Sequence, residues 1–309
     1  MTKILINLYQ LLNLTLKNNL QIKYIKHKNY KLAYRVWYNN NDNPTLLFAH
    51  ASGFHSMIWN QIIQKINNYN CIAIDFSGHG MSDNPDIEYK WDQFSNEIHS
   101  LIVELKLNKI IGIGHSLGAY AITHSTKDLY DRFESLILFD PSIFTKNKYA
   151  IKIKSRSEPH PISKRRDSWI STDEMYQRFS KRYPFIYWDK SVLVDYIEYG
   201  LTYNQSKKIY NLSSPPWAEA RMMQGSAEYG IFDIINSFNK DVLILRASGK
   251  KSNENNDIFS KSVTDPDLHK LFSNSTDLLI DDVTHFIPQE KPQECAKIIN
   301  DHLNLLLKD

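Results

Sequence analysis

The 309-residue sequence predicts an α/β protein with a doubly wound, mostly parallel sheet. Short apolar runs alternate with helical patterns along the chain, as in proteins that build a parallel sheet from strand–helix units. The third to sixth runs lack the in/out alternation of strands with one exposed face, so both faces of the sheet are expected to be covered. The length and the 42% content of hydrophobic residues allow a sizeable core that needs no disulfide or metal.

Eight apolar runs are the predicted strands, and stretches with helical spacing of apolar residues separate several of them. The strands are expected at residues 21–26, 32–38, 45–49, 71–75, 109–114, 135–139, 242–246 and 277–280. Three helical patterns separate the third to sixth predicted strands from one another. They lie at residues 57–66, 94–105 and 120–129.

The long segment between the sixth and seventh predicted strands interrupts this alternation and shows mostly helical patterns. We predict a core of residues 21–142 and 236–309, with an inserted helical cap at residues 143–235. Most of the many aromatic side chains of the cap are expected to form its own core, and a few to line a substrate pocket. The cap begins with a basic run at residues 146–166, which either forms a solvated face or attracts an anionic substrate.

Composition and charge favour a small-molecule substrate over nucleic acid. The 37 Lys and Arg residues nearly balance the 34 Asp and Glu residues, which leaves a net charge of +3. Cys71 and Cys295 are far apart and lack neighbouring ligands, so we expect no disulfide, metal site or cofactor. No apolar run approaches the roughly 20 residues that span a bilayer. We expect a cytoplasmic protein in which residues 1–20 form an N-terminal arm or surface helix, the alternative being a signal-peptide core at residues 4–16. No oligomeric state follows from the sequence.

The motif Gly114-His115-Ser116-Leu117-Gly118 follows a predicted strand and opens a helical pattern. This is the context of a G-x-S-x-G nucleophile elbow, in which a strained turn exposes the serine at the carboxyl edge of the sheet. Small residues two positions before and after the serine let the turn close. We predict that Ser116 is the nucleophile; the alternative is a glycine-rich turn in which the serine has no chemical role.

Two backbone amides are predicted to stabilise an oxyanion. The Leu117 amide lies at the start of the helix that follows Ser116, where free N–H groups and the helix dipole favour negative charge. The second donor is expected on Ser52, in the loop after the third strand. We interpret His50 as ordering that loop by hydrogen bonds, and the loop at residues 75–82 as scaffold.

A serine nucleophile needs a base that an acid holds in place. His285 is the predicted base because it follows the last predicted strand by a short loop, whereas His269 and His302 lie in helical patterns where solvated side chains are expected. Asp140 directly follows the sixth strand and is the predicted acid. The alternatives for the acid are Glu254 and Asp257, which come after the seventh strand, and a purely structural Asp-Pro turn at Asp140.

Taken in order, His50 and its loop, the segment 75–82, the elbow at Ser116, Asp140 and His285 resemble the α/β-hydrolase superfamily. The chain looks most similar to bacterial members with a helical cap inserted after the sixth strand. Two departures are visible: Ala51 stands where the family mostly has glycine after the histidine, and the usual glycine-x-x-aspartate after the penultimate strand is absent. The second departure favours relatives that place the acid after the sixth strand, at the position of Asp140.

The resemblance and the predicted residues together imply a serine hydrolase that cleaves a small, apolar carboxylic ester or lactone through an acyl-enzyme. Related haloalkane dehalogenases and epoxide hydrolases use aspartate where this chain has Ser116. Two alternatives stay open: a ligand-binding or signalling protein with little turnover on the same fold, and an acyltransferase whose acceptor is not water.

Overall fold

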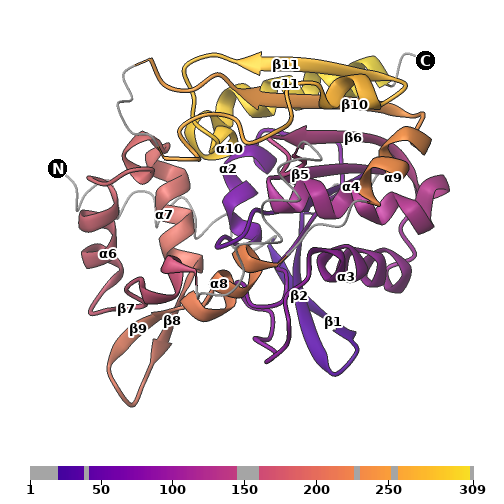
Figure 1. Ribbon diagram of the computed structural model, residues 1–309. Coiled ribbons are helices and arrows are strands. Elements are labelled where there is room, and N and C mark those ends of the chain that lie inside the picture. Colours follow the sequence, from indigo (N-terminus) through magenta and orange to yellow (C-terminus); the bar gives the residue numbers. More distant parts are fainter. Residues whose placement is uncertain (1–19, 38–41, 145–159, 226–229, 252–256, 307–309) are drawn as a thin grey trace.

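A central eight-stranded sheet organises the protein (Figure 1). The computed structural model describes residues 20–37, 42–144, 160–225, 230–251 and 257–306. The strands are β1 (Gln21–His27), β2 (Tyr30–Trp37), β3 (Thr45–Ala49), β4 (Cys71–Ile74), β5 (Ile110–His115), β6 (Phe133–Phe139), β10 (Asp241–Ala247) and β11 (Ser275–Ile280). Their order is β1-β2-β4-β3-β5-β6-β10-β11, with β2 antiparallel to both neighbours and the strands from β4 to β11 parallel. The eight predicted strands and the mostly parallel sheet are confirmed.

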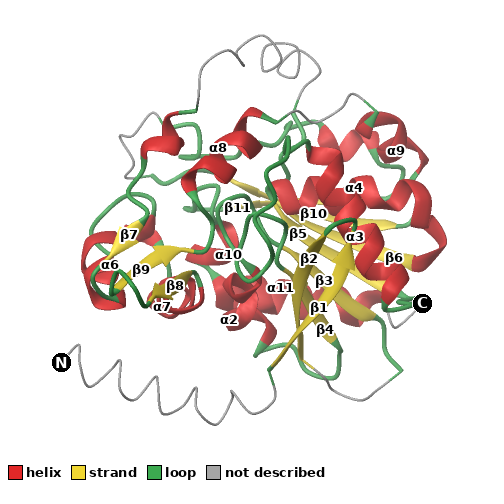
Figure 2. Ribbon diagram, turned by 90° about the horizontal axis from the view of Figure 1, so that it is seen from below, coloured by secondary structure: helices red, strands yellow, loops and turns green. Residues whose placement is uncertain are grey.

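Helices cover both faces of this sheet (Figure 2). One face carries α3 (Trp91–Glu104), α4 (Leu117–Leu129) and α9 (Ile231–Ser237). The other carries the 3-10 helix η1 (Ser56–Trp59), α2 (Asn60–Ile63) and α11 (Pro292–Leu306). Three shorter helices complete the core: η2 (Tyr130–Arg132), η5 (Leu268–Leu271) and α10 (Ile287–Glu290).

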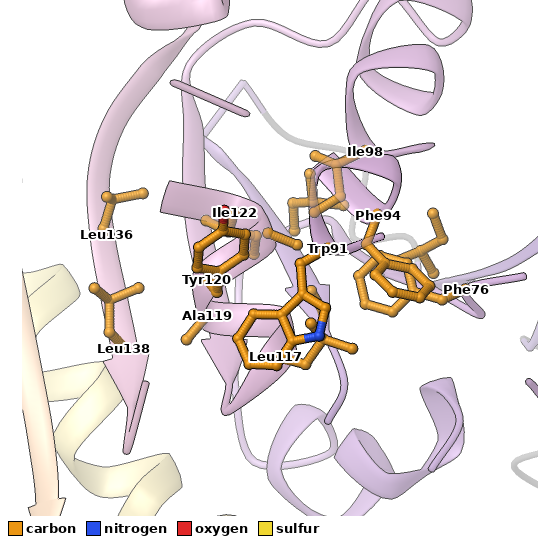
Figure 3. Packing of buried hydrophobic residues seen from close by; sticks show 14 of the residues in the cluster. Phe76, Trp91, Phe94, Ile98, Leu117, Ala119, Tyr120, Ile122, Leu136 and Leu138 are labelled. Carbon is orange, nitrogen blue, oxygen red and sulfur yellow. The ribbon is translucent and has the colours of Figure 1, made fainter. Parts of the chain in front are cut away.

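Aromatic packing fixes α3 and α4 against each other. Trp91 of α3 and Tyr120 of α4 meet edge to face with ring centroids 5.2 Å apart, and Phe94 packs on Phe76 at 5.1 Å (Figure 3). All four side chains are buried, so α4 cannot shift along the sheet without breaking the contact of Tyr120 with Trp91, while Phe76 holds α3 through Phe94. The helix that follows Ser116 is therefore held firmly.

The segment between β6 and β10 contains a small sheet that the helical prediction missed. Besides α9, the described elements of this segment are η3 (Pro161–Lys164), β7 (Ser168–Trp169), α6 (Thr172–Phe179), η4 (Phe185–Tyr187), α7 (Lys190–Tyr199), β8 (Leu201–Asn204), β9 (Ile209–Leu212) and α8 (Pro216–Gln224). The three strands pair in the order β7-β9-β8, antiparallel throughout. Strands of two to four residues are too short to show a period in the sequence, which is why the prediction was incomplete. Residues 145–159 and 226–229 of the predicted cap lie outside the described residues.

The fold shows the surroundings of the two cysteines and of the two histidines that were predicted to be solvated. Cys71 and Cys295 are buried, unpaired thiols. The prediction of a solvated His302 was wrong, because its ring is buried and Nε2 lies 3.0 Å from the Ser135 hydroxyl; His269 is also partly buried. The predicted N-terminal arm or helix falls, apart from residue 20, outside the described residues. Within the described part of the chain, no helix is long and apolar enough to cross a membrane.

Candidate active site

Ser116 occupies a strained turn between β5 and α4. Its backbone angles, φ 56° and ψ −117°, lie in a region that L-residues rarely adopt. A Cβ atom on Gly114 would stand 2.4 Å from the Ala119 Cα, and one on Gly118 would stand 2.3 Å from the Ala49 carbonyl oxygen. Both neighbours are backbone atoms that cannot yield cheaply, so the turn requires glycine at these positions. The predicted strand–turn–helix context of the serine is confirmed.

His285 faces this serine from the loop after β11. Its Nε2 lies 3.0 Å from the Ser116 Oγ. The backbone of His285 is anchored on both sides, since its N–H donates to the Phe259 carbonyl and its own carbonyl accepts from the His115 Nε2, each at 3.0 Å. The ring stacks on Phe259 with centroids 5.1 Å apart. The imidazole therefore has one well-defined orientation toward Ser116.

Asp140 completes the arrangement at the end of β6. It is fully buried, and its Oδ2 lies 2.5 Å from the His285 Nδ1. An ionised carboxylate can only accept hydrogen bonds, so the proton of the neutral imidazole belongs on Nδ1, and Nε2 is free to accept the Ser116 hydroxyl proton. Further donors surround the carboxylate: the amides of Ala247 and Val263 and the hydroxyls of Ser262 and Thr264.

Of the two alternative acids, the described one, Asp257, has other partners. The Asp257 carboxylate accepts from the Phe259 amide at 2.8 Å and from the Tyr183 hydroxyl at 3.4 Å. The His285 Nδ1 is bound to Asp140 instead. Glu254 lies outside the described residues.

The two predicted oxyanion donors have amides that bond to no other described residue. Leu117 is the first residue of α4, and Ser116 caps the amino end of this helix. The Ala51 carbonyl accepts from the His50 Nδ1 at 2.7 Å and from the Phe54 amide at 3.3 Å. Because N–H and C=O point in opposite directions across a trans peptide, these bonds set the direction of the Ser52 N–H. The expected role of His50 in ordering the loop therefore has a geometric basis.

Two residues near Ser116 were missed by the sequence analysis as candidates for the site. The Ser142 Oγ lies 3.0 Å from the Ser116 Oγ, and the Ser142 amide donates to the Ser116 carbonyl at 3.1 Å. Its position two residues after Asp140, at the same sheet edge, was the available signal. The ring of His115 lies 4.9 Å from that of His285. Burial lowers the pKa of His115 well below its usual range, so this ring stays neutral and adds no positive charge beside His285.

Aromatic side chains from the core and from the predicted cap meet next to His285. Phe286 and Phe54 have ring centroids 6.0 Å apart, and Trp188 lies 5.8 Å from Phe286 and 5.3 Å from Phe54. Phe286 and Phe259 are only partly buried, so they present an apolar wall beside the imidazole.

The described part of the basic run 146–166 contains two arginines that pair with carboxylates. Arg165 lies 2.7 Å from the buried Glu219, and Arg166 lies 2.6 Å from Glu174. Both charges are thereby largely balanced, although Lys146 to Arg156 fall in the undescribed range. Among the described residues, no group of three or more His, Cys, Asp or Glu side chains could hold a metal ion.

Comparison with known proteins places the chain in a family. A sequence model described as "Alpha/beta hydrolase family" matches residues 46–298. The chain belongs to the alpha/beta hydrolase family. The recognised resemblance and the fold class are thus confirmed.

Two curated relatives illustrate the similarity in sequence. An uncharacterised protein of Mycobacterium tuberculosis is 31% identical over 122 residues, which cover 38% of this chain and 34% of that protein. The 2-(acetamidomethylene)succinate hydrolase of Mesorhizobium japonicum is 30% identical over 98 residues, covering 31% of this chain and 35% of the hydrolase. The match thus spans about a third of the length of these curated relatives.

A solved structure extends the likeness of the fold over nearly the whole chain. The crystal structure of E-2-(acetamidomethylene)succinate hydrolase superposes with a TM-score of 0.70, covering 92% of this chain and 99% of that one. The sequence identity over the superposition is 18%, so this similarity concerns the fold.

Proposed function

We propose that this member of the family is a serine hydrolase that cleaves a small, apolar carboxylic ester or lactone through an acyl-enzyme on Ser116. The observation that carries the proposal is the continuous chain from the Ser116 Oγ to the His285 Nε2, at 3.0 Å, and from the His285 Nδ1 to the Asp140 Oδ2, at 2.5 Å. Nucleophile, base and acid at these distances, with the serine on a nucleophile elbow, form the arrangement that activates serine for acyl transfer.

In the acylation step, the Ser116 Oγ attacks the carbonyl carbon of the ester while its proton passes to the His285 Nε2. The new C–O bond forms as the carbonyl π-electrons move onto oxygen. Collapse of this tetrahedral intermediate breaks the bond to the leaving alkoxide, which takes the proton from the His285 Nε2. Asp140 stabilises the transient imidazolium and keeps the ring oriented, without itself taking the proton.

The developing oxyanion is stabilised by the amides of Leu117 and Ser52, which have no partner among the described residues. Because the Ser116 proton goes to His285, the Ser142 hydroxyl is the donor in its contact with the Ser116 Oγ. Water then repeats the sequence on the acyl-enzyme: His285 accepts its proton, the hydroxide oxygen bonds to the acyl carbon, and the Ser116 Oγ leaves with the proton that His285 returns.

The surroundings of His285 support an uncharged, apolar substrate. Phe259 and Phe286 offer partly exposed rings beside the base, and the buried Phe54 and Trp188 pack against Phe286. Arg165 is paired with Glu219, which argues against its use as a binding group for an anionic substrate. The hydrolase from Mesorhizobium japonicum supports hydrolysis as the reaction type for this chain as well.

A panel of p-nitrophenyl esters and lactones, graded by acyl length, tests this proposal. We expect turnover of short apolar substrates by the native protein, loss of turnover in Ser116→Ala, and labelling of Ser116 by a fluorophosphonate. Equal turnover by the native protein and a folded Ser116→Ala variant would contradict the proposal. Labelling without hydrolysis would point to a ligand-binding protein, and an acylated acceptor other than water among the products would identify an acyltransferase.

A further inference from the structure

The loop at residues 75–82 does more than support the sheet, because one of its side chains binds the predicted oxyanion loop. His79 is fully buried, and its Nε2 accepts a hydrogen bond of 2.9 Å from the Gly53 amide. Gly53 directly follows Ser52, whose amide is a donor to the oxyanion in the proposed function. We propose that His79 is a positioning residue that holds the Ser52–Gly53 peptide and so maintains the oxyanion hole. This inference rests on the proposed function.

Two peptide planes flank the Ser52 Cα, and a histidine fixes each of them. His50 binds the Ala51 carbonyl of the first plane through Nδ1, at 2.7 Å. His79 binds the Gly53 amide of the second plane. The first plane carries the Ser52 N–H, and holding the second plane as well prevents rotation about the backbone bonds of Ser52, so that the first plane and its N–H keep one orientation. The position of this donor is therefore set by a pair of side chains from two different loops.

The second plane is the one that needs such a restraint. Gly53 has φ +80° and no Cβ, and glycine adopts positive and negative φ with similar ease. The backbone of Gly53 therefore does not itself prevent a flip of the Ser52–Gly53 peptide, and the bond to the His79 Nε2, at 2.9 Å, is shorter than the 3.5 Å contact of the Gly53 carbonyl with the Tyr196 hydroxyl. Losing the acceptor on His79 would also leave a buried amide without a partner, which favours rearrangement of the loop.

The hydrogen bonds of His79 define its tautomer. Since Nε2 accepts from an amide, the proton lies on Nδ1, which donates to the Ser77 carbonyl at 3.1 Å. His50 has the same pattern, because its Nε2 accepts from the Phe76 amide at 3.1 Å. The two rings meet edge to face with centroids 4.8 Å apart. Burial lowers the pKa of His79 well below its usual range, which keeps Nε2 unprotonated and able to accept.

A buried carboxylate anchors the far side of this connection. Glu97 of α3 is fully buried and accepts from the Ser77 hydroxyl at 2.6 Å and from the Ser77 amide at 3.0 Å. Ser77 in turn provides the carbonyl that orients His79. The restraint on Gly53 therefore extends through His79 and Ser77 into the core helix α3.

The test compares two substitutions of His79 with one control histidine. His79→Leu removes the acceptor at similar volume, whereas His79→Gln keeps a side-chain oxygen that can accept from the Gly53 amide. His302→Leu is the matched control, because His302 is also buried but contacts Ser135 at the amino end of β6. For each variant, kcat and KM are measured with the best ester of the panel, together with inhibition by a trifluoromethyl ketone of the same acyl length and the melting temperature. The ketone adduct places an oxyanion in the hole, whereas the ground-state substrate does not depend on it.

We expect His79→Leu to lower kcat by about 10- to 100-fold, somewhat less than the loss of an oxyanion donor itself, with little change in KM. Inhibition by the ketone should weaken by a similar factor. His79→Gln should recover most of both losses, and His302→Leu should lower the melting temperature with kcat within about twofold of native, because it touches no group of the site.

The proposal is overturned if folded His79→Leu keeps a kcat within about twofold of native, or if kcat falls while ketone inhibition is unchanged. Equal losses in the Gln and Leu variants would also overturn it. Should His79→Leu not fold, His79→Met gives the same comparison, and failure of both to fold would assign His79 a structural role only. Failure of the proposed function is distinguishable, because it would leave the native protein unlabelled by a fluorophosphonate, would leave it labelled but without ester turnover, or would leave Ser116→Ala active.

Discussion

The Asp140→Asn substitution isolates the contribution of the acid to the proposed chemistry. Asp140 is fully buried, and its carboxylate binds the His285 Nδ1 at 2.5 Å. Asparagine has nearly the same shape, so the volume of the site is retained. The negative charge beside the imidazole is lost in either orientation of the new amide.

The contacts of Asp140 allow the effects of this substitution on kcat and on the free energy of unfolding to be estimated. If the amide NH2 takes the place of Oδ2, it opposes the Val263 N–H at 3.2 Å and forces the His285 proton onto Nε2, which blocks the base. If it takes the place of Oδ1, it opposes the Ala247 N–H at 3.3 Å, and the imidazolium still lacks its counter-charge. We therefore expect kcat to fall by roughly 10³- to 10⁴-fold, the scale of a triad acid replaced by its amide. One opposed backbone donor should lower the free energy of unfolding by about 1–3 kcal/mol.

The assay combines steady-state hydrolysis of a p-nitrophenyl ester with urea unfolding, so that loss of activity can be separated from loss of folded protein. Asp257→Asn is the matched control, because its carboxylate accepts from the Phe259 amide and does not contact His285. Glu254→Gln tests the remaining alternative acid. A near-native rate of hydrolysis by folded Asp140→Asn, combined with a large loss of hydrolysis in Asp257→Asn or Glu254→Gln, would refute the assignment of Asp140 as the acid.

Two further predictions concern the elbow and the buried histidines. Gly118→Ala should destabilise the protein by roughly 1–3 kcal/mol and reduce hydrolysis, since its Cβ would stand 2.3 Å from the Ala49 carbonyl, whereas Gly230→Ala, with nothing within 4 Å, should be neutral in urea unfolding and hydrolysis. Equal behaviour of these variants would contradict the packing argument. Burial lowers the pKa of His50 and of His55 to about 4, so the unfolded chain takes up protons first as the pH falls. The contribution of the two neutral histidines to the free energy of unfolding is complete above pH 6.5. It falls by roughly 3 kcal/mol for each histidine between about pH 6.5 and 4. Urea unfolding at pH 7.5, 5.5 and 4 measures this loss, and a free energy of unfolding that stays constant over this range would be inconsistent with it.

Local patterns were sufficient to predict the sheet and the elbow. The apolar runs correspond to the eight strands, and the glycines around Ser116 are required by backbone atoms that approach within 2.4 Å of their Cβ positions. Asp140 and His285 could be predicted as partners because the carboxyl ends of parallel strands meet at one edge. Their catalytic roles remain predictions.

Contacts between distant segments could not be predicted in the same way. Ser262 and Thr264 bind the Asp140 carboxylate from 122 and 124 residues along the chain, in a loop with no motif of its own. The contact of His79 with Gly53 joins two loops whose glycines indicate turns but not their hydrogen bonds. The short strands β7, β8 and β9 depend on pairing with one another rather than on a sequence period.

Trapping the acyl-enzyme tests the central claim most directly. The native protein is mixed with a p-nitrophenyl ester that it turns over, quenched in acid within the first turnovers, and analysed by intact-mass and peptide mass spectrometry. We expect a mass increase equal to one acyl group, located on Ser116, and its absence in Ser116→Ala. Hydrolysis of the ester with no acyl group on Ser116 in the quenched protein, or with the acyl group on another residue, would contradict the account.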